Sequence, residues 1–309
     1  MRHVKLLILS GMVAAGLALI GCSESTNGPD QLSLTSDDTN QIENIIDTNE
    51  LFDSGEATLN DGGAVSGDLQ SLGKTATPIL PYAWGRKITS VGRTISYERI
   101  DDSTATATIT FTFTGQFLIA AKYSLQDTSV SLITKDFTQT TTRKARFYKN
   151  ALNRWALRAV SAVQGTTEGS EITITKVDVI TDTDTLTISD PTSTYMRLPH
   201  FGGRELMQWG TTTPTRVRVT LTSTSPDTDL VAIHRPWMLG NAFHPLRVRM
   251  NMVSQEQNGS VYLRVYELSW NAHVAGWHHL FVDAITRGTL FDDTEAVSAQ
   301  LWGIPFYVQ

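Results

Sequence analysis

Residues 104–114 alternate strictly between threonine and an apolar residue, and this period of two restricts the fold more than any other feature of the chain. The apolar members are Ala105, Ala107, Ile109, Phe111 and Phe113. Because successive side chains of a strand point to opposite faces, the segment predicts a long strand with one apolar and one threonine-covered face. Gly115 then predicts a bulge or bend. Further strands are predicted at 94–100, 117–123, 137–149, 155–160, 171–180 and 185–189.

Shorter alternating segments fill the last third of the chain. They follow residues 190–215, where prolines and the pair Gly202-Gly203 indicate a domain junction. Six or seven short strands are predicted there, which is the number typical of an immunoglobulin-like β-sandwich. We therefore expect two folded domains, residues 37–195 and 196–309.

One amphipathic helix is predicted before the strands, over about residues 38–53. Ile42, Ile45, Ile46 and Phe52 fall near one stripe, and Asp38 with Gln41 has the spacing of a capping box. A helix of this length is only marginally stable alone, so we expect its stripe to dock on the sheet. The fold class expected for residues 37–195 is α+β and mostly β, with one helix and a curled antiparallel sheet, as in a cystatin-like roll.

Several short segments in this region resemble nuclear-transport-factor-like domains, in which a sheet curls around a helix. They are Trp84-Gly85-Arg86-Lys87-Ile88, residues 105–115, residues 143–147 and Arg154-Trp155. The resemblance implies a cone-shaped cavity that is either packed or holds a ligand or a catalytic pair. Residues 38–165 contain no histidine, so histidine-assisted chemistry is unsupported there. A plain β-sandwich is the alternative fold.

The first 21 residues have the pattern of a secretory signal peptide. Arg2 and Lys5 precede a mainly apolar run over residues 6–20, which is shorter than the roughly 20 residues needed to span a bilayer. Leu19-Ile20-Gly21-Cys22 resembles the lipobox of bacterial lipoproteins, and this resemblance implies a diacylglycerol anchor on Cys22. Cys22 is the only cysteine, so no intrachain disulfide can form. Ser23 follows it instead of aspartate, which favours the outer membrane, with either a periplasmic or a surface-facing orientation.

Residues 23–80 are strongly acidic, with eleven Asp or Glu and one basic residue, Lys74. We interpret residues 22–36 as a solvated tether and residues 54–80 as a connection to the sheet. Residues 81–309 hold 22 basic and 20 acidic side chains, and the net charge of the chain is −6. This balance excludes a dedicated nucleic-acid-binding protein. The expected partners are the membrane, through the lipid anchor, and an envelope protein or a glycan.

Two kinds of metal site are considered. The histidines after the signal are His200, His234, His244, His273, His278 and His279. No pair has a spacing that places two nitrogens on one side of a strand, so zinc is disfavoured. The carboxylates of Asp283, Asp292, Asp293 and Glu295 could meet where strands join a loop, and they are the candidate calcium ligands, although their spacing is not that of an EF-hand. No other cofactor is expected.

Trp237, Trp270 and Trp277 are candidate ligand-binding residues, because exposed indoles in a row can stack on sugar rings. We favour the alternative that they pack in the core, since Trp270 adjoins an alternating run. One cluster of basic residues has two interpretations. It is either a binding patch for acidic polysaccharide or lipopolysaccharide, or the solvated face of a hairpin, and we favour the second. Its members are Arg143, Lys144, Arg146, Lys149, Arg154 and Arg158.

The sequence holds no Gly-x-Ser-x-Gly elbow, Walker A loop, dinucleotide-binding glycine motif or zinc-protease signature. We therefore assign no catalytic residue and predict a non-enzymatic envelope lipoprotein of binding or scaffolding type. Two alternatives stay open. One is a carbohydrate-binding surface module that uses the three tryptophans, and the other is an enzyme with a dispersed carboxylate site in the cavity of the roll.

Overall fold

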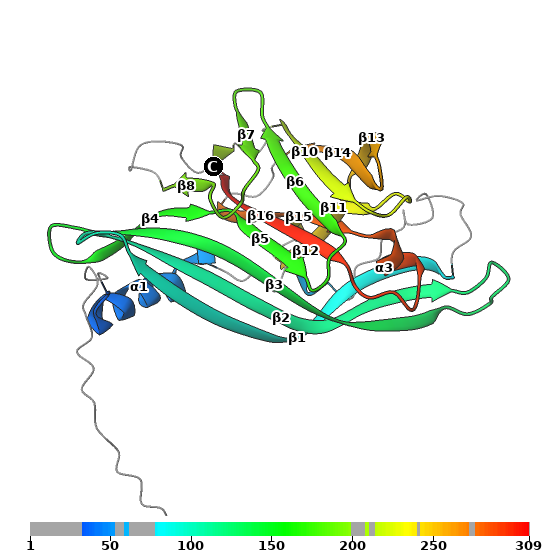
Figure 1. Cartoon of the computed structure of the whole chain (residues 1–309), viewed down its shortest axis with the longest axis horizontal. Helices are drawn as coiled ribbons and strands as arrows, with labels where there is room; N and C mark the ends of the chain where they lie inside the picture. Colours follow the sequence, from blue (N-terminus) through cyan, green and yellow to red (C-terminus); the bar gives the residue numbers. More distant parts are fainter. Residues whose placement is uncertain are drawn as a thin grey trace, which may run out of the picture. The chain divides into compact units, whose positions relative to one another are not determined.

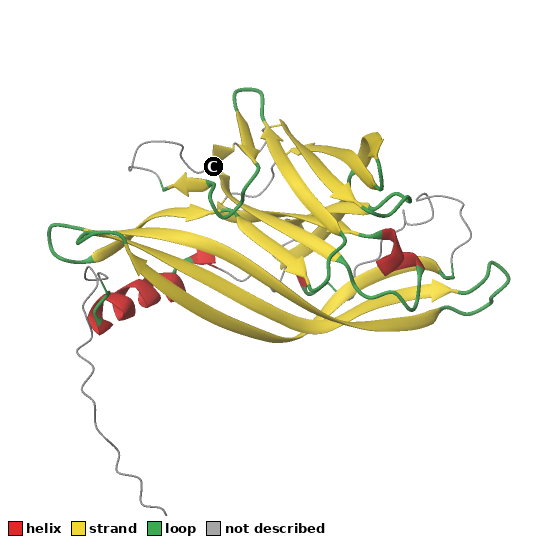
Figure 2. Ribbon diagram, viewed as in Figure 1, coloured by secondary structure: helices red, strands yellow, loops and turns green. Residues whose placement is uncertain are grey.

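The computed structural model describes residues 33–52, 59–61, 78–198, 208–209, 214–239, 242–271 and 276–308 (Figure 1). Leu32–Gln309 form one compact unit. The described chain is mostly β-strand, as predicted, and Figure 2 shows two sheets with little helix. The predicted signal peptide, Cys22 and nearly all of the predicted tether lie outside the described residues.

The larger sheet is antiparallel along its main path and curls into a half-barrel (Figure 1). Its path runs β1-β2-β3-β5-β16-β15-β11-β12, and β4, β8 and β9 attach at its sides. The first strands are β1 (Leu80–Arg99), β2 (Thr104–Lys122), β3 (Ser131–Lys149), β4 (Trp155–Ser161), β5 (Val163–Thr167) and β8 (Tyr195–Arg197). The later strands are β9 (Gln208–Trp209), β11 (Leu230–Leu239), β12 (Ala242–Arg249), β15 (Gly276–Ile285) and β16 (Ala299–Val308).

The smaller sheet runs in the order β13-β14-β10-β6-β7. Its strands are β6 (Ile172–Ile180), β7 (Thr185–Ile188), β10 (Pro214–Ser223), β13 (Asn251–Asn258) and β14 (Val261–Asn271). Apolar side chains of β6 and β10 pack in one core with those of β11, β15 and β16. The two sheets therefore share a buried layer, as in a β-sandwich.

Each sheet contains strands from both sides of the predicted domain junction. In the larger sheet β16 pairs with β5, and in the smaller sheet β10 pairs with β6. Backbone pairing and core packing therefore connect residues 37–195 with residues 196–309, and the two do not form separate units in the fold. The physical reason is that a sheet can take its strands from distant parts of the chain, whereas a proline- and glycine-rich segment indicates only a connection.

Strand β2 confirms the predicted alternation. In β2 the odd-numbered residues from Ala105 to Ala121 are buried, except for Phe111, and the threonines lie on the partly exposed face. The pairing of β2 with β3 is unbroken from Thr104 opposite Tyr148 to Ala121 opposite Ser131. One face of a very long strand is therefore core and the other is threonine-covered surface.

Gly115 lies opposite a β-bulge and is not itself the bulge, which corrects the prediction. The strand β2 continues through it, and the register slips in β1 between Ile88 and Ser90, so that Thr89 is the extra residue. A Cβ atom on Gly115 would lie 2.3 Å from the carbonyl oxygen of Lys87. The glycine therefore permits a close backbone approach where the partner strand bends.

Helix α1 (Ser36–Thr48) begins two residues earlier and ends five residues earlier than predicted, and a 3₁₀ turn, η1 (Glu50–Phe52), follows. Its cap is Thr35, whose hydroxyl accepts from the Asp38 amide at 3.2 Å, while the Asp38 carboxylate accepts from the Thr35 amide at 3.3 Å. The capping box thus lies three residues before the predicted one. Ile42 and Ile46 are buried in the core shared with β2, β3 and β4, which confirms the docked stripe.

Two groups of elements cover the inner face of the larger sheet. Near the β1–β2 hairpin it is covered by α1, and the side chains beneath the helix are apolar, among them Ala107, Phe147 and Leu157. Farther along, the same face packs against β15, β16 and the short helix α3 (Arg287–Phe291). In the described chain the roll is therefore filled by core side chains below its helix.

Candidate functional site

A network of buried charged side chains crosses the inside of the half-barrel. Arg86 on β1 donates two hydrogen bonds to Asp283 on β15, at 2.6 and 2.9 Å, and neither side chain is more than 1% exposed. Nε2 of His234 on β11 lies 3.0 Å from the same carboxylate. Asp61 accepts from Arg247 on β12 at 2.6 Å and from the Arg86 amide at 2.8 Å. Because β1 and β12 are the two ends of the sheet's path, the network ties together the edges of the curled sheet.

The charges of this network balance, with two arginines against two aspartates. Burial raises the pKa of Asp283. Arg86 and the hydrogen bond from His234 lower it by more than burial raises it, so the pKa lies well below its usual value. Burial lowers the pKa of Arg86, but Asp283 and Asp61 raise it above its ordinary value. Both groups therefore stay charged and bonded to each other, which is the chemistry of a structural clamp and not that of a general acid or base.

An aromatic layer extends the network. The guanidinium of Arg247 lies 3.4 Å from the ring centroid of Trp84, and its Nη2 donates to the Trp84 carbonyl oxygen at 2.6 Å. Trp84 stacks on Phe117 with 5.2 Å between the ring centroids. The cation is therefore held by a ring face as well as by Asp61.

Sequence reasoning did not find this network, because its members come from five separate segments of the chain. The one local signal is a charged residue at an inward position of a strand. Asp283 stands between Phe281 and Ile285, and Arg86 stands between Trp84 and Ile88, all of them on buried faces.

A second polar contact joins β3 and β15 of the larger sheet, and it involves one residue of the predicted basic cluster. Arg143 on β3 lies 3.3 Å from Nε2 of His279 on β15 and donates to the carbonyl oxygen of Leu51. Burial, Arg143 and His278 all lower the pKa of His279 well below its usual value, so its imidazole is neutral at neutral pH. Arg143 thus faces inward, and it is not part of a surface patch.

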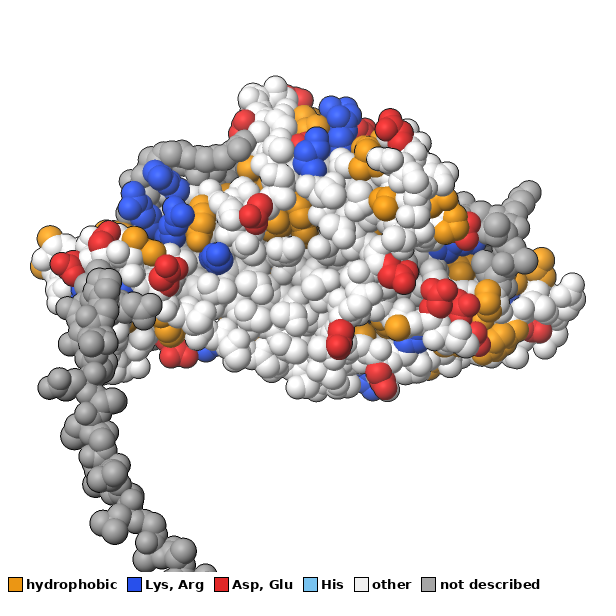
Figure 3. All heavy atoms as spheres, in the orientation of Figure 1, with side chains coloured by type: hydrophobic (Ala, Val, Ile, Leu, Met, Phe, Trp, Pro, Cys, Tyr) orange, Lys and Arg blue, Asp and Glu red, His pale blue; other side chains and the backbone are white. Residues whose placement is uncertain are grey.

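Two of the remaining cations of that cluster lie in different places. Lys149 pairs with Asp38 at 2.7 Å and holds the start of α1. Arg146 is exposed on the outer face and stacks on the Tyr195 ring, with its guanidinium carbon 3.9 Å from the centroid. Figure 3 shows a group of Lys and Arg side chains at the left of the molecule, over β4 and β8 of Figure 1.

The four candidate calcium ligands do not share one environment. Asp283 is in the buried network, whereas the Asp292 carboxylate accepts from the amide and hydroxyl of Thr294, at 2.7 and 2.6 Å, and from the Glu295 amide at 3.2 Å. Asp292 thereby closes its own turn, which is an ordinary role of aspartate. In the described ranges no group of three or more His, Cys, Asp or Glu side chains is placed to hold a metal ion. Asp293 lies in the same turn as Asp292.

Trp270 is the one candidate tryptophan whose side chain is described, since those of Trp237 and Trp277 lie outside the description. It is half-buried on β14, packs against the core and lines a shallow hollow of about 300 Å³. Arg216 and Asp182 line the same hollow. An indole beside polar side chains is a combination that can bind a sugar ring.

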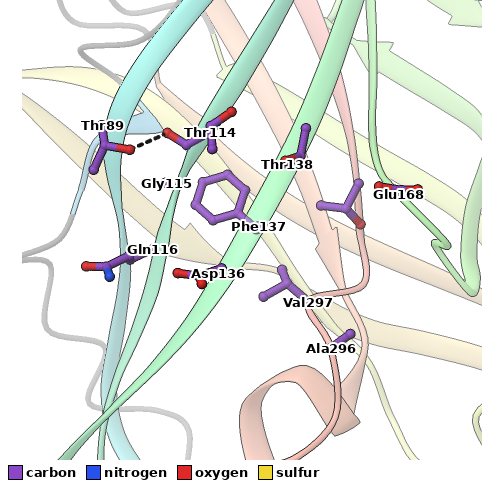
Figure 4. Close-up of a pocket in the computed structure, with 11 residues that line it drawn as sticks. Thr89, Thr114, Gly115, Gln116, Asp136, Phe137, Thr138, Glu168, Ala296 and Val297 are labelled. Carbon is purple, nitrogen blue, oxygen red and sulfur yellow. Dashed lines mark hydrogen bonds between the residues drawn. The ribbon is translucent and has the colours of Figure 1, made fainter. Parts of the chain in front are cut away.

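A wider groove of about 620 Å³ lies between β3 and the segment that leads into β16 (Figure 4). Phe137 and Val297 supply apolar surface, and Gln116, Asp136 and Glu168 supply polar side chains around it. Among the described residues that line this groove, none has a basic side chain. Its chemistry therefore fits a neutral or cationic ligand better than an anionic one.

The turn of the β2–β3 hairpin carries large exposed apolar side chains, and we name it the distal tip. It comprises Tyr123, Leu125, Val130 and Leu132, of which Leu125 is 80% and Leu132 67% exposed. The Asp127 carboxylate accepts from the amides of Tyr123 and Ser124, both at 2.9 Å, and so orders the turn. Figure 3 shows apolar side chains at the right-hand end, where this hairpin lies in Figure 1.

Comparison of the chain with protein-family models gives no match, and comparison with curated proteins gives none either. Among the described helices, none combines the length and the apolar character that crossing a membrane requires. The functional argument therefore depends on the geometry of this chain alone.

Proposed function

We propose that the chain is a lipid-anchored, non-enzymatic protein of the bacterial cell envelope that binds a protein partner through its distal tip. The observation that carries the proposal is the group of exposed apolar side chains at the end of a long hairpin whose turn is bonded through Asp127. The lipobox resemblance at Leu19–Cys22 supports the anchor, and it leaves the folded body in water beside the outer membrane.

The distal tip is suited to binding because it is both apolar and ordered. Full burial of one leucine side chain contributes about 1.5–3 kcal/mol, so the two leucines can supply the apolar centre of a larger contact. The Asp127 bonds fix the turn before binding, which reduces the entropy lost on association. Large apolar side chains that project together from a soluble protein commonly mark a contact surface.

The interior supports a binding protein over an enzyme. The carboxylates inside the half-barrel, Asp61 and Asp283, are bonded to Arg247 and Arg86, and the space beneath α1 is filled with apolar side chains. These acids stabilise the fold, which leaves the described interior without a free carboxylate pair.

We also propose the finer description of the fold. Docking of α1 on the curled sheet of β1 to β4 supports a cystatin-like roll. Two facing layers support an immunoglobulin-like arrangement of residues 196–309. One layer holds β10, β13 and β14, the other holds β11, β12, β15 and β16, and strands of the first half complete both.

The anchor is tested by mass spectrometry of Cys22 in protein purified from its native cell. We expect an acylated amino-terminal cysteine, and we expect Cys22→Ser to release the protein from membranes with an unchanged thermal midpoint. An unmodified thiol in membrane-bound protein would reject the anchor.

The tip is tested by a photo-crosslinking amino acid at position 125 in living cells. We expect one reproducible crosslinked partner peptide, which is lost when Leu132→Ser is added. The matched control is the same probe at Val253 on β13, which is also more than half exposed. Equal crosslinking from both positions, or none from position 125, would reject the distal tip as a binding element.

Two alternatives have an observation in their favour. The hollow beside Trp270 favours a carbohydrate-binding surface module, and sugar binding in a glycan array that Trp270→Ala abolishes would establish it. The groove beside Asp136 and Glu168 favours an enzyme with dispersed carboxylates, and hydrolase turnover that both Asp136→Asn and Glu168→Gln abolish would establish that one.

A further inference from the structure

Two neighbouring turns carry exposed apolar side chains at the end of the sheet opposite the distal tip. Ile100 in the β1–β2 turn is 51% exposed, and Leu152 in the β3–β4 turn is 76% exposed. The Lys149 amide donates to the Ser103 carbonyl oxygen at 2.7 Å, so the two turns lie side by side. We name Ile100 and Leu152 the proximal tips.

The described chain begins beside the proximal tips. Nη1 of Arg99 donates to the carbonyl oxygen of Ser33 at 3.2 Å. Lys149 and the indole nitrogen of Trp155 bind the Asp38 carboxylate, at 2.7 and 2.8 Å, and so hold the start of α1 at the same place. The last residues of the predicted tether, from Ser33 on, and the start of α1 are therefore attached next to these two turns.

The length of the tether limits how far this end can move from an anchored Cys22. Eleven residue steps separate Cys22 from Ser33, and fully extended they span at most about 40 Å. The 19 residues of β2, which runs from the proximal to the distal end, follow a path of about 60 Å. An anchored Cys22 would therefore keep Ser33, which lies beside the proximal tips, within about 40 Å of the bilayer, whereas the distal tip can lie farther away.

Charges around the proximal tips permit contact with phospholipid headgroups. Arg154 is exposed in the same turn as Leu152. Asp101 and Asp102 are in the other turn, where Arg99 pairs with Asp102 at 2.9 Å and the Asp101 carboxylate accepts from the Ser103 amide. The two cations Arg99 and Arg154 equal the two carboxylates in number, so the two turns together carry no net negative charge.

We propose that the proximal tips dock on the bilayer that holds the lipid anchor, with Ile100 and Leu152 inserted at the boundary of headgroups and acyl chains. The inference rests on the proposed lipid anchor at Cys22. Two apolar side chains alone give only weak affinity for a bilayer. A lipid anchor raises their effective concentration at the membrane, because the contact then forms within one tethered molecule, as in multivalent binding. The body would then stand with its distal tip directed away from the membrane.

The test uses an environment-sensitive fluorophore on a single introduced cysteine. The mature chain carries Cys22→Ser and an amino-terminal histidine tag, and it is held on phosphatidylethanolamine–phosphatidylglycerol vesicles through a nickel-chelating lipid. The label is placed by Leu152→Cys, and the matched control is Leu125→Cys, whose native side chain has a similar exposure. We expect blue-shifted, more intense emission from position 152 and unchanged emission from position 125 when the protein is bound.

A second variant addresses the docking contact itself. Adding Ile100→Ser to the chain labelled at position 152 should return most of the emission to its value in water. Equal emission changes at positions 152 and 125, or none at either, would overturn the proposal. Because the histidine tag replaces the acyl anchor, these outcomes do not depend on whether Cys22 is acylated, which mass spectrometry decides separately.

Discussion

Replacing Asp283 with asparagine should destabilise the protein strongly although it changes the side-chain shape very little. The carboxylate lies in the interior of the half-barrel, accepts two bonds from Arg86 and contacts His234 at 3.0 Å. An asparagine keeps the volume, so no cavity forms, but it leaves the buried Arg86 charge without its counterion. The perturbation therefore isolates the electrostatic part of the network.

The expected cost follows from the burial of the pair. Breaking a fully buried, hydrogen-bonded ion pair by removing one partner costs about 3–5 kcal/mol, and Arg86 and Asp283 are 1% and 0% exposed. A typical domain has about 5–15 kcal/mol of total stability, so this change removes a large part of it. Asp102→Asn is the matched control, because Asp102 pairs with Arg99 at the surface, where ion pairs contribute about 1 kcal/mol or less.

The measurement is urea unfolding of the Cys22→Ser mature chain at pH 7, followed by tryptophan fluorescence, since Trp84 stacks beside the network. We expect a lower midpoint with an unchanged slope. The double variant Arg86→Met with Asp283→Leu should recover most of the loss, because it removes both buried charges. A loss below about 1 kcal/mol in Asp283→Asn would refute the argument that this pair clamps the sheet.

Three further changes test the sheet and the helix. The pKa of His279 is lowered in the folded state, so below about pH 6.5 only the unfolded state binds a proton there, and the free energy of unfolding should fall by up to about 1.4 kcal/mol per pH unit. His279→Gln should remove this pH dependence in denaturation measured at pH 5–7. Gly115→Ala should cost about 1–3 kcal/mol of stability because its Cβ would meet the Lys87 carbonyl, whereas a Cβ at Gly92 lies 3.9 Å from its nearest neighbour, so Gly92→Ala should not destabilise the protein. A lower unfolding midpoint for Gly92→Ala than for Gly115→Ala would contradict this. Thr35→Ala should cost about 1 kcal/mol by removing the cap of α1, and an unchanged thermal midpoint would argue against that cap.

Local features were predictable because each is written in neighbouring residues. The alternation of threonine with apolar residues determined the two faces of β2, and the isoleucine stripe determined which side of α1 is buried. The ends of α1 were predicted less accurately. Both Thr35 and Asp38 are suitable N-cap residues, and only the docked geometry decides between them. Periodicity therefore specified the element and its buried face before its exact limits.

Strand partners and the inner ion network were decided by tertiary structure. Pairing of β16 with β5 depends on residues more than 130 positions apart, and no local pattern records it. The same holds for Arg86 and Asp283, which become partners only when the sheet curls, and for Arg143 and His279, which meet between β3 and β15. Side-chain period is a property of a short segment, whereas pairing and charge neutralisation depend on which distant segments the buried surface brings together.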